Sequence, residues 1–360
     1  MKEKTRVVIV GTVGIPACYG GFESLVENLT LHKSDNVNYT VFCSSKAYKT
    51  KLKFHNGAEL VYLPWKANGL QSIFYDIFSL VKCIFLKPDV VLILGVSGCI
   101  FLPFFKLFST SKIITNIDGL EWKRNKWSVA VKKFLKFSEM VAVKFSDVVV
   151  TDNKAIGDYV DSEYRRDNVT IAYGGDHAIR NSLTSIAVES IEHNIESYSL
   201  GLCRIEPENN VEMILEAFTA TSKKIKFVGN WEASEFGQML KNKYKEYGNI
   251  ELLDPIYDLD ILYELRSRCS LYLHGHSAGG TNPSLVEMMH FGVPIIAFDC
   301  KFNRYSTDDK AIYFKSKNDL IEIIQKVDKK TLIDVSTNMK AIAEERYTWR
   351  EISRQYEVIY

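Results

Sequence analysis

The sequence lacks the patterns that mark metal-binding, disulfide-stabilised and disordered proteins. Its seven cysteines are spread over 360 residues, and no two of them form a Cys-x-x-Cys pair. Neither a zinc site nor a disulfide framework is therefore indicated, and we expect free thiols in a reducing compartment. The chain has only 8 prolines and 20 glycines, while 46% of its residues are hydrophobic, which excludes a collagen-like or low-complexity protein.

The sequence also lacks a charge excess and a long apolar segment. A formal net charge of +1 gives no sign of a nucleic-acid partner. The most apolar stretch, Val90–Phe105, contains Gly95, Gly98 and Pro103 and is shorter than the roughly 20 residues of a membrane-spanning helix. The run Val7–Val10 is too short for the core of a signal peptide. We expect a cytoplasmic protein that reaches a membrane only from that side.

The balanced net charge conceals an asymmetry between the two halves of the chain. Residues 1–172 contain 23 basic and 16 acidic side chains, a surplus of seven positive charges. Residues 173–360 contain 22 basic and 28 acidic side chains, a surplus of six negative charges. This distribution indicates two parts with different neighbours, and a solvated surface without a partner is the alternative.

The length indicates two domains, because one domain usually contains about 100–200 residues. Buried strands are expected at Val7–Val10, Tyr39–Cys43, Glu59–Tyr62, Val90–Leu94, Lys112–Asn116, Val148–Thr151 and Val169–Ile171, and then at Tyr198–Cys203, Ile225–Gly229, Ile250–Leu253, Leu271–His274, Val293–Phe298 and Ala311–Phe314. Amphipathic helices are expected at Gly21–Leu31, Ser72–Leu86, Val129–Phe145, Glu208–Thr221, Tyr257–Arg268, Pro283–Phe291 and Lys317–Val327. This alternation is typical of parallel sheets with helices on both faces.

We therefore predict an α/β protein with two Rossmann-like, doubly wound domains that face a cleft. The first domain is expected at 1–175 and the second at 176–345, with a helical segment at 346–360 that crosses back to the first domain. Ligands in such sheets bind at the carboxyl ends of the strands. The residues that follow each strand are therefore the candidates for function.

The first candidate segment is Gly11–Glu23, which is rich in glycine and lies between a strand and a helix. Backbone amides in such a loop can approach a phosphate, and a helix N-terminus favours anions. The glycine spacing matches neither the dinucleotide-binding pattern nor the P-loop. A long glycine turn without a ligand is the alternative.

The second candidate is Arg204, which follows the first strand of the second domain. Its permanently charged guanidinium suits the oxygens of a phosphate. A surface ion pair with Glu206 or Glu208 is the alternative.

The third candidate segment is His274–Glu287, where a strand, a glycine loop and a helix follow one another. Asn282 is suited to cap the helix and Pro283 to begin it, so free amides would face an anion. The Glu287 carboxylate, one turn further on, is placed to accept hydrogen bonds from sugar hydroxyls. His274 and His276 lack an evident third ligand, so a metal site is disfavoured.

The fourth candidate segment follows another strand and contains Asp118 and Glu121. Next to these carboxylates, tryptophan and basic residues alternate in a way that favours anionic membrane surfaces. We predict that the first domain docks on the cytoplasmic face of the membrane through Trp122, Lys123, Arg124, Lys126, Trp127, Lys132, Lys133 and Lys136. A solvated basic helix face is the alternative.

These four segments, in this order, resemble the GT-B glycosyltransferases of family four over almost the whole chain. The more specific segments, Gly11–Glu23, Asp118–Trp122 and Gly279–Ser284, are similar to bacterial rhamnosyltransferases of capsule and cell-wall polysaccharide assembly. The resemblance implies a retaining transfer from a nucleotide-diphosphate sugar, without a metal or another cofactor. It places the donor mainly on the second domain and the acceptor on the first.

The resemblance also assigns residues to the site. Arg204 occupies the position of the diphosphate-binding arginine, and Asp118 is the second catalytic candidate, through the orientation of acceptor or donor hydroxyls. The residues implied for donor binding are Gly20, Gly21, Arg204, Asn209, Gly280, Thr281, Asn282, Ser284 and Glu287. Those implied for acceptor binding are Tyr19, Asp118 and Glu121.

Two positions depart from the family pattern. Asn209 stands near the place of a lysine that pairs with the arginine, and Gly279 stands where the first of two glutamates is usual. The missing lysine removes one cation from the leaving group. The missing glutamate removes a usual contact to the sugar ring.

The expected reaction is the transfer of L-rhamnose from dTDP-rhamnose to a lipid-linked saccharide in bacterial surface polysaccharide synthesis. Three alternatives are a transferase that uses a UDP-hexose, a sugar-nucleotide epimerase of the same fold, and a catalytically inactive binding module in a glycan-assembly complex. A dehydrogenase is disfavoured because the first loop lacks the dinucleotide-binding pattern.

Overall fold

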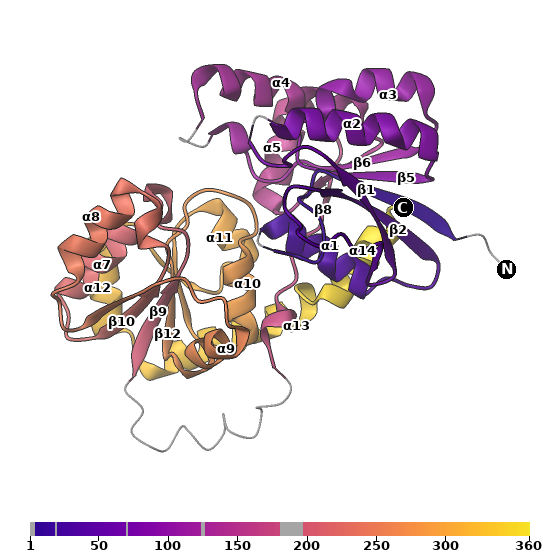
Figure 1. Ribbon diagram of the computed structural model, residues 1–360. Helices are drawn as coiled ribbons and strands as arrows, with labels where there is room; N and C mark the ends of the chain where they lie inside the picture. The colour runs from indigo at the N-terminus through magenta and orange to yellow at the C-terminus, as the bar shows by residue number, and fades with distance from the viewer. Residues whose placement is uncertain (1–3, 19, 70, 124–126, 181–196) are drawn as a thin grey trace. The chain divides into compact units, whose positions relative to one another are not determined.

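The computed structural model describes residues 4–18, 20–69, 71–123, 127–180 and 197–360. The chain forms two compact units, which are described separately. Unit 1 contains Met1–Tyr173 and Trp349–Tyr360, and unit 2 contains Gly174–Thr348. The C-terminal segment of the chain therefore belongs to the same unit as the N-terminal half (Figure 1).

Unit 1 is built on an eight-stranded sheet with the order β3-β4-β2-β1-β5-β6-β7-β8. Its strands are β1 (Thr5–Val10), β2 (Val37–Ser44), β3 (Phe54–His55), β4 (Ala58–Leu63), β5 (Val90–Leu94), β6 (Lys112–Asn116), β7 (Val148–Thr151) and β8 (Val169–Thr170). All neighbouring strands are parallel except β3 and β4, which form an antiparallel hairpin at the edge. The seven parallel strands end at the same edge of the sheet, so the loops that follow them share one edge, the carboxyl edge of unit 1.

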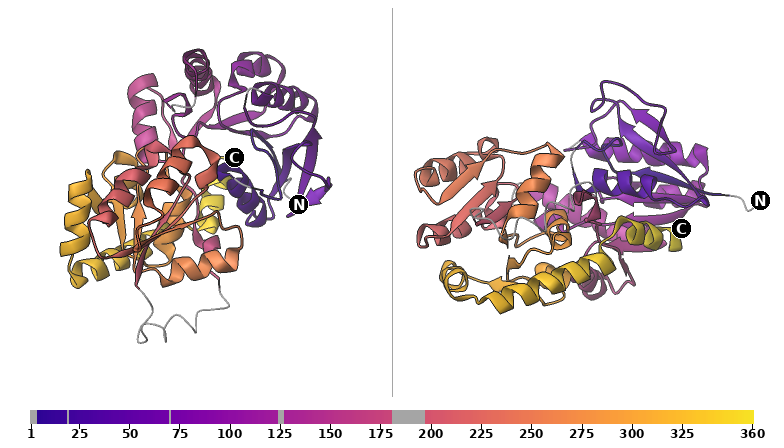
Figure 2. Two further views of the ribbon diagram at one scale, coloured as in Figure 1. Left: turned by 60° about the vertical axis from the view of Figure 1, so that its left-hand side comes forward. Right: turned by 90° about the horizontal axis from the view of Figure 1, so that it is seen from below.

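Helices cover both faces of this sheet (Figures 1 and 2). One face carries α2 (Gln71–Leu86), α3 (Leu102–Phe108), α4 (Val129–Phe145) and α5 (Lys154–Tyr164), and the other carries α1 (Gly21–Leu31) and α14 (Trp349–Val358). Three short 3-10 helices lie at Cys99–Phe101, Glu121–Lys123 and, in unit 2, Asp176–Ala178. No helix in the described part of the chain combines the length and the apolar character that crossing a membrane requires.

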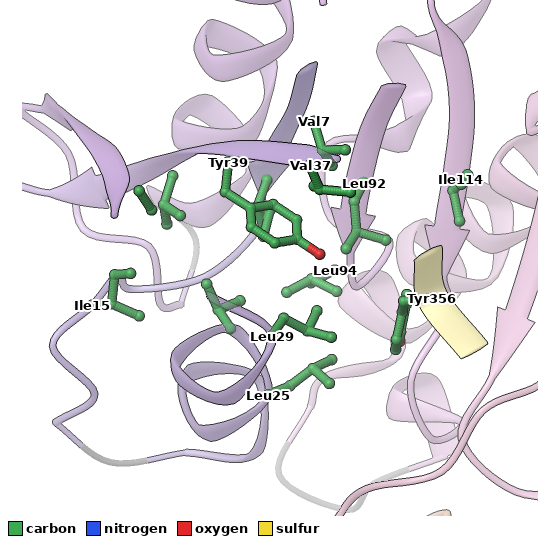
Figure 3. Packing of buried hydrophobic residues seen from close by; sticks show 14 of the residues in the cluster. Val7, Ile15, Leu25, Leu29, Val37, Tyr39, Leu92, Leu94, Ile114 and Tyr356 are labelled. Carbon is green, nitrogen blue, oxygen red and sulfur yellow. The ribbon is translucent and has the colours of Figure 1, made fainter. Parts of the chain in front are cut away.

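The core on the α1 and α14 face joins segments from both ends of the chain (Figure 3). Leu92 and Ile114 of the central strands are fully buried, as are Leu25 and Leu29 of α1. Tyr356 of α14 is equally buried in the same cluster. Apolar side chains on both faces of the strands explain why their sequences are continuous β-branched runs.

Unit 2 is built on a six-stranded sheet with the order β11-β10-β9-β12-β13-β14, in which every neighbouring pair is parallel. Its strands are β9 (Tyr198–Leu202), β10 (Lys224–Val228), β11 (Ile250–Leu253), β12 (Leu271–His274), β13 (Ile295–Phe298) and β14 (Ile312–Phe314). Its helices are α7 (Val211–Thr219), α8 (Glu235–Tyr244), α9 (Leu259–Arg268), α10 (Pro283–His290), α11 (Lys301–Ser306), α12 (Lys317–Lys326) and α13 (Lys329–Arg346), with 3-10 helices at Pro207–Asn209 and Trp231–Ala233. Helix α7 packs beside α12, and α10 packs beside α13.

The predicted alternation of strands and helices is confirmed in both units, with differences at some positions. The structure adds the hairpin strand β3 and the helices α5, α8, α11 and α13, which the sequence analysis did not place. The predicted helix Glu208–Thr221 is divided, because Asn210 has a φ of 50° between a 3-10 helix and α7. The left-handed conformation of Asn210 interrupts the helix, and the spacing of apolar residues in the sequence gives no sign of this interruption.

Candidate functional site

The glycine-rich loop after β1 is held by a carboxylate from α1. Glu23 is 7% exposed, and its Oε1 accepts hydrogen bonds from the Thr12 hydroxyl at 3.0 Å and the Val13 amide at 2.8 Å. Gly20 precedes α1 with a φ of 136°, and a Cβ at this position would collide with the Glu23 carboxylate. The loop therefore needs glycine at residue 20, both for its backbone angle and for the space that Glu23 occupies.

A polar cluster lies on the carboxyl edge of unit 1, beside this loop. A Cβ at Gly21 would lie 3.4 Å from the hydroxyl of Tyr173, which follows β8. Burial raises the pKa of the Tyr173 hydroxyl well above its ordinary value, and the negative charges of Asp118 and Asp152 raise it further. Because Asp118 follows β6 and Asp152 follows the adjacent strand β7, the three side chains belong to one cluster.

Asp118 is held in an uncommon backbone conformation. Its φ is 59°, and its amide donates a hydrogen bond to Oδ1 of Asn116 at 3.0 Å. Asn116 is buried, and its amide nitrogen donates to the Tyr356 hydroxyl at 2.9 Å. A left-handed conformation in a residue other than glycine marks a position that its surroundings fix. The half-buried Asp118 carboxylate is thus positioned by a strand end and by α14.

The neighbouring acceptor candidate, Glu121, accepts a hydrogen bond from Trp127 Nε1 at 3.0 Å. Trp122 is fixed in the same manner, because its Nε1 donates to Oε2 of the buried Glu139 at 3.0 Å. Tyr19, the third acceptor candidate, lies outside the described residues. So do Arg124 and Lys126 of the predicted membrane segment.

In unit 2, Arg204 follows β9 and is available to a ligand. Its side chain is 50% exposed, and its only ion pair with a described residue joins Nη1 to Oε1 of Glu206 at 3.5 Å. Asn209 is 2% exposed, and its side-chain amide donates to the Arg204 carbonyl at 2.8 Å. The structure thus gives Asn209 a part in shaping the Arg204 loop, whereas the Arg204 guanidinium faces solvent.

The loops that follow β9 and β12 are bonded to one another. Asn210 donates to the Gly275 carbonyl at 2.8 Å, and the Ser277 amide donates to the Glu208 carbonyl at 3.0 Å. The buried Tyr272 hydroxyl lies 3.4 Å from the Leu202 carbonyl and 3.2 Å from the Ser284 hydroxyl. These contacts bring the Arg204 loop and the start of α10 to one place, the carboxyl edge of unit 2.

Helix α10 begins at this edge, but its first-turn amides are not free as predicted, because Asn282 accepts hydrogen bonds from the amides of residues 284–286. Asn282 caps the helix through Oδ1, which accepts from the Ser284 amide at 3.2 Å and from the Ser284 hydroxyl at 2.9 Å. Pro283 stands at the first helical position, as predicted. The preceding loop holds Gly280 and the buried Thr281, and Gly279 has a φ of 119°. The partial positive charge of the helix N-terminus therefore favours an anion beside Arg204.

Glu287, one turn into α10, is held by Arg266 and His177. Its Oε2 forms a short ion pair with Nη2 of Arg266 from α9, and its Oε1 lies 3.3 Å from Nε2 of His177. Burial opposes ionisation, but the charges of Arg266 and His177 hold the pKa of the Glu287 carboxyl below its ordinary value. Glu287 is therefore an ionised, oriented acceptor for hydroxyl groups.

His274 at the end of β12 is 1% exposed, and neither ring nitrogen has a hydrogen-bond partner among the residues that the structure describes. Its ring stacks on His276 with centroids 4.4 Å apart. Burial lowers the pKa of the His274 imidazole well below its ordinary value, and the nearby His276 adds to the effect. The ring is therefore neutral in the folded protein.

Within the described residues, no group of three histidine, cysteine, aspartate or glutamate side chains is placed to hold a metal ion. The structure brings the predicted residues together within each unit: Gly20, Gly21 and Asp118 on one carboxyl edge, and Arg204, Asn282, Ser284 and Glu287 on the other.

Sequence reasoning missed several residues of these edges. Asp152 directly follows a predicted strand, so the strand-end rule used for Asp118 also identifies it. Glu23 belongs to the first candidate segment, Gly11–Glu23, but its sequence context did not predict that it would hold the glycine-rich loop. Arg266 and His177 gave no signal, because only the packing of α9 and α10 brings them to Glu287.

Comparisons with known proteins give the fold a context. The model of a family described as a domain of unknown function (DUF1972) matches residues 4–176. No curated protein sequence matches the chain. Among solved structures, the chain is similar to sucrose-phosphate synthase from Thermosynechococcus elongatus, with a TM-score of 0.82 and 12% identity over 99% of this chain and 98% of that one.

Two further structures are similar over 99% of both chains. HepE from Anabaena, solved in complex with UDP, has a TM-score of 0.73 and 14% identity. The catalytic domain of starch synthase IV from Arabidopsis thaliana, bound to ADP and acarbose, has a TM-score of 0.72 and 11% identity. The chain therefore has the GT-B fold of glycosyltransferases, and the predicted fold class is confirmed.

Proposed function

We propose that the protein is a glycosyltransferase that takes its sugar from a nucleotide-diphosphate donor bound by unit 2. The observation that carries the proposal is the carboxyl edge of unit 2, where Arg204, the start of α10 and Glu287 converge. The fold supports it, because similar chains include HepE, solved in complex with UDP-glucose. Arg204 and the positive N-terminal end of α10 suit a diphosphate, and Glu287 suits the hydroxyls of a ribose.

Catalysis in this proposal consists of stabilising the departing nucleotide diphosphate. The glycosidic carbon loses its bond to the diphosphate oxygen, and negative charge grows on that oxygen. Donors that are already oriented stabilise such charge most effectively, and here they are the Arg204 guanidinium and the positive end of the α10 dipole. In a retaining reaction the acceptor hydroxyl attacks from the face that the diphosphate leaves, and a phosphate oxygen takes its proton. Asp118 would orient hydroxyl groups.

We further propose L-rhamnose from dTDP-rhamnose as the transferred sugar and a lipid-linked saccharide as the acceptor, with transfer at the cytoplasmic face of the membrane. The support is the similarity of Gly11–Glu23 and Gly279–Ser284 to bacterial rhamnosyltransferases. Acceptor binding is assigned to unit 1, with Tyr19, Asp118 and Glu121. A UDP-hexose donor is the second candidate, because HepE is solved with UDP and with UDP-glucose.

A donor screen tests these proposals. Purified protein is incubated with dTDP-rhamnose and with UDP-hexoses, each with membranes that carry lipid-linked acceptors, and the products are analysed by mass spectrometry. Addition of a deoxyhexose from dTDP-rhamnose is the expected result. Addition of a hexose alone would overturn the rhamnose assignment and retain the transferase. Conversion of a donor without any acceptor would indicate an epimerase, and donor binding without turnover would indicate an inactive module.

The independence from metal ions stays a prediction and is tested in the same assay. Treatment with a chelator is expected to leave the rate unchanged. Loss of activity that magnesium or manganese restores would contradict it.

A further inference from the structure

The outer surface of α2 is apolar, although the helix lies at the surface of unit 1. Phe74, Phe78, Lys82 and Phe85 lie on successive turns of one side of the helix and are all exposed, with Phe85 79% exposed. The opposite side faces the sheet through buried residues such as Tyr75 and Leu80. Phe78 stacks on Trp65 with centroids 4.3 Å apart, whereas Phe74 and Phe85 present more than half of their surface to solvent.

The two neighbouring helices continue this surface. Helix α3 contacts both α2 and α4, and the three lie on the same face of the sheet (Figures 1 and 2). Leu107 and Phe108 of α3 are 75% and 68% exposed, and Val129 of α4 is 72% exposed. The α2–α4 face is defined by the exposed apolar residues of these helices: Phe74, Phe78, Phe85, Leu86, Phe104, Leu107, Phe108, Val129, Phe137 and Met140.

The charged groups of the α2–α4 face are of one sign. The three helices, all described in full, contain two carboxylates, and both are buried: Asp76 is 3% exposed and Glu139 is 2% exposed. Lysines, in contrast, stand between the apolar residues. Two of these lysines form ion pairs with carboxylates of neighbouring segments: Lys106 pairs with Asp147, and Lys136 pairs with Glu163. The lysines without an ion pair to any residue that the structure describes are Lys82, Lys132, Lys133 and Lys144.

At one end of this face lies a groove of about 710 Å³. Its lining is aromatic and apolar through Trp122, Phe137 and Met140. Lysines including Lys132 and Lys133 stand around it, and its one carboxylate, Glu163, is paired with Lys136 at 2.9 Å. Trp122 cannot swing away freely, because its indole nitrogen is bonded to the buried Glu139. The groove thus combines an apolar lining with ammonium groups beside it.

We infer that the α2–α4 face docks on an anionic lipid bilayer. Phenylalanine and leucine side chains enter the boundary of the acyl chains, and lysines place their ammonium groups among the lipid phosphates while their stems lie along apolar surface. A bilayer is favoured over a protein partner because the unpaired charge has one sign across three helices and accompanies scattered, protruding aromatic side chains. The inference extends the tryptophan and lysine segment noted in the sequence, and it does not rest on the proposed sugar transfer.

The charge requirement is tested by sedimentation of the full-length protein with vesicles. The wild type is expected to bind vesicles of phosphatidylcholine and phosphatidylglycerol at low salt, to bind pure phosphatidylcholine weakly, and to be released by high salt. A triple variant, Lys132→Glu, Lys133→Glu and Lys144→Glu, is expected to bind at least about tenfold more weakly. A control with the same change in net charge, Lys245→Glu, Lys329→Glu and Lys330→Glu in unit 2, is expected to bind like the wild type.

The apolar requirement is tested with Phe85→Ser, Leu107→Ser and Phe108→Ser together, which are expected to weaken binding about tenfold. The matched control replaces the exposed apolar residues Leu259, Ile261 and Ile333 of unit 2 with serine. Circular dichroism checks that every variant is folded. Equal effects of variant and control, or no binding of the wild type to anionic vesicles, would overturn the inference.

The alternative to a membrane is that the α2–α4 face binds a second copy of the chain, and the same variants test this alternative. Analytical ultracentrifugation that shows a dimer which the serine variant dissociates, without vesicle binding, would assign the face to self-association and overturn the membrane proposal. The result is independent of the donor screen, because vesicle binding is measured without any substrate.

Discussion

Arg204 is the residue whose exposure and charge most directly suit a ligand. Within the described part of the chain its only ion pair is the long one to Glu206 at 3.5 Å, and its side chain is half exposed. An exposed pair of this kind contributes little to stability. The weak pair with Glu206 leaves the Arg204 guanidinium accessible to the diphosphate that the proposed function assigns to it.

We expect Arg204→Ala to keep the fold and to lose about two orders of magnitude in transfer rate, as the removal of one oriented donor does in other enzymes. Steady-state kinetics with the active donor measures the loss, and thermal melting checks the fold. The control is Glu206→Ala, which removes the same ion pair and keeps the guanidinium. A full rate in Arg204→Ala, or an equal loss in the control, would exclude the assigned role.

His274 gives the protein a dependence on pH with a definite sign. Because the pKa of its buried imidazole is well below the ordinary value, the unfolded chain binds a proton that the folded chain does not. The free energy of unfolding is therefore retained above the ordinary histidine pKa and falls as the pH drops below it, by up to about 1.4 kcal/mol per pH unit for one proton. Burial also lowers the pKa of His290, which acts in the same direction.

His274→Phe is expected to remove the His274 share of this dependence. At pH 7 the two proteins should differ by less than about 1.5 kcal/mol, because the rings are of similar size and no described hydrogen bond is lost. At pH 5 the variant should be the more stable in urea unfolding. The control His32→Gln changes an exposed histidine and should leave the slope unchanged. Parallel pH profiles of wild type and His274→Phe would contradict the prediction.

At the scale of elements, α9 and α10 are joined by a buried ion pair. Arg266 is 6% exposed and contacts Glu287, which is also largely buried. Removing one member leaves the other charge buried without its partner, which is far more costly than losing a surface pair. The same pair orients the carboxylate that the proposed function assigns to the donor.

Arg266→Ala is expected to lower the free energy of unfolding by about 3–5 kcal/mol. Arg268→Ala, two residues along the same helix, is the matched control, because Arg268 is 48% exposed and pairs with Glu264 at 3.4 Å. Arg268→Ala should lower the free energy of unfolding by less than about 1 kcal/mol. Denaturant unfolding of both variants measures the difference, and equal losses would show that the buried pair has no special weight.

The sequence predicted those elements that its local patterns encode. The strands Val90–Leu94 and Lys112–Asn116 and the helices Gly21–Leu31 and Val129–Phe145 have the predicted bounds, because continuous apolar runs and amphipathic stripes determine them. Helix α13 was missed because its apolar stripe is weak: it buries few residues over Lys329–Arg346. The strand-end rule located the candidate site, whereas the partners of Glu287 arise only from packing between helices.

At the scale of the whole molecule, unit 1 is completed by α14, which comes from the other end of the sequence. Helix α14 follows unit 2 in the sequence, yet it packs beside α1 in the core of unit 1. The Tyr356 hydroxyl accepts a hydrogen bond from Asn116, and the Ser34 amide donates to Glu357 at 2.7 Å. Unit 1 is therefore incomplete until α14 has been synthesised, and its β6 end, with Asp118, is supported by a residue more than 200 positions away.

Trp349 makes this dependence measurable. It is 1% exposed and belongs to the unit 1 core, so Trp349→Ala is expected to cost about 3–5 kcal/mol of stability. The loss should appear as faster hydrogen exchange in β1, β2 and α1, while β9 and β10 of unit 2 keep their protection, although Trp349 follows unit 2 directly in the sequence. Val358→Ala, at a residue 71% exposed on the same helix, should change neither unit. Faster exchange in unit 2 alone would show that the C-terminal helix stabilises its neighbour in sequence and not the distant sheet.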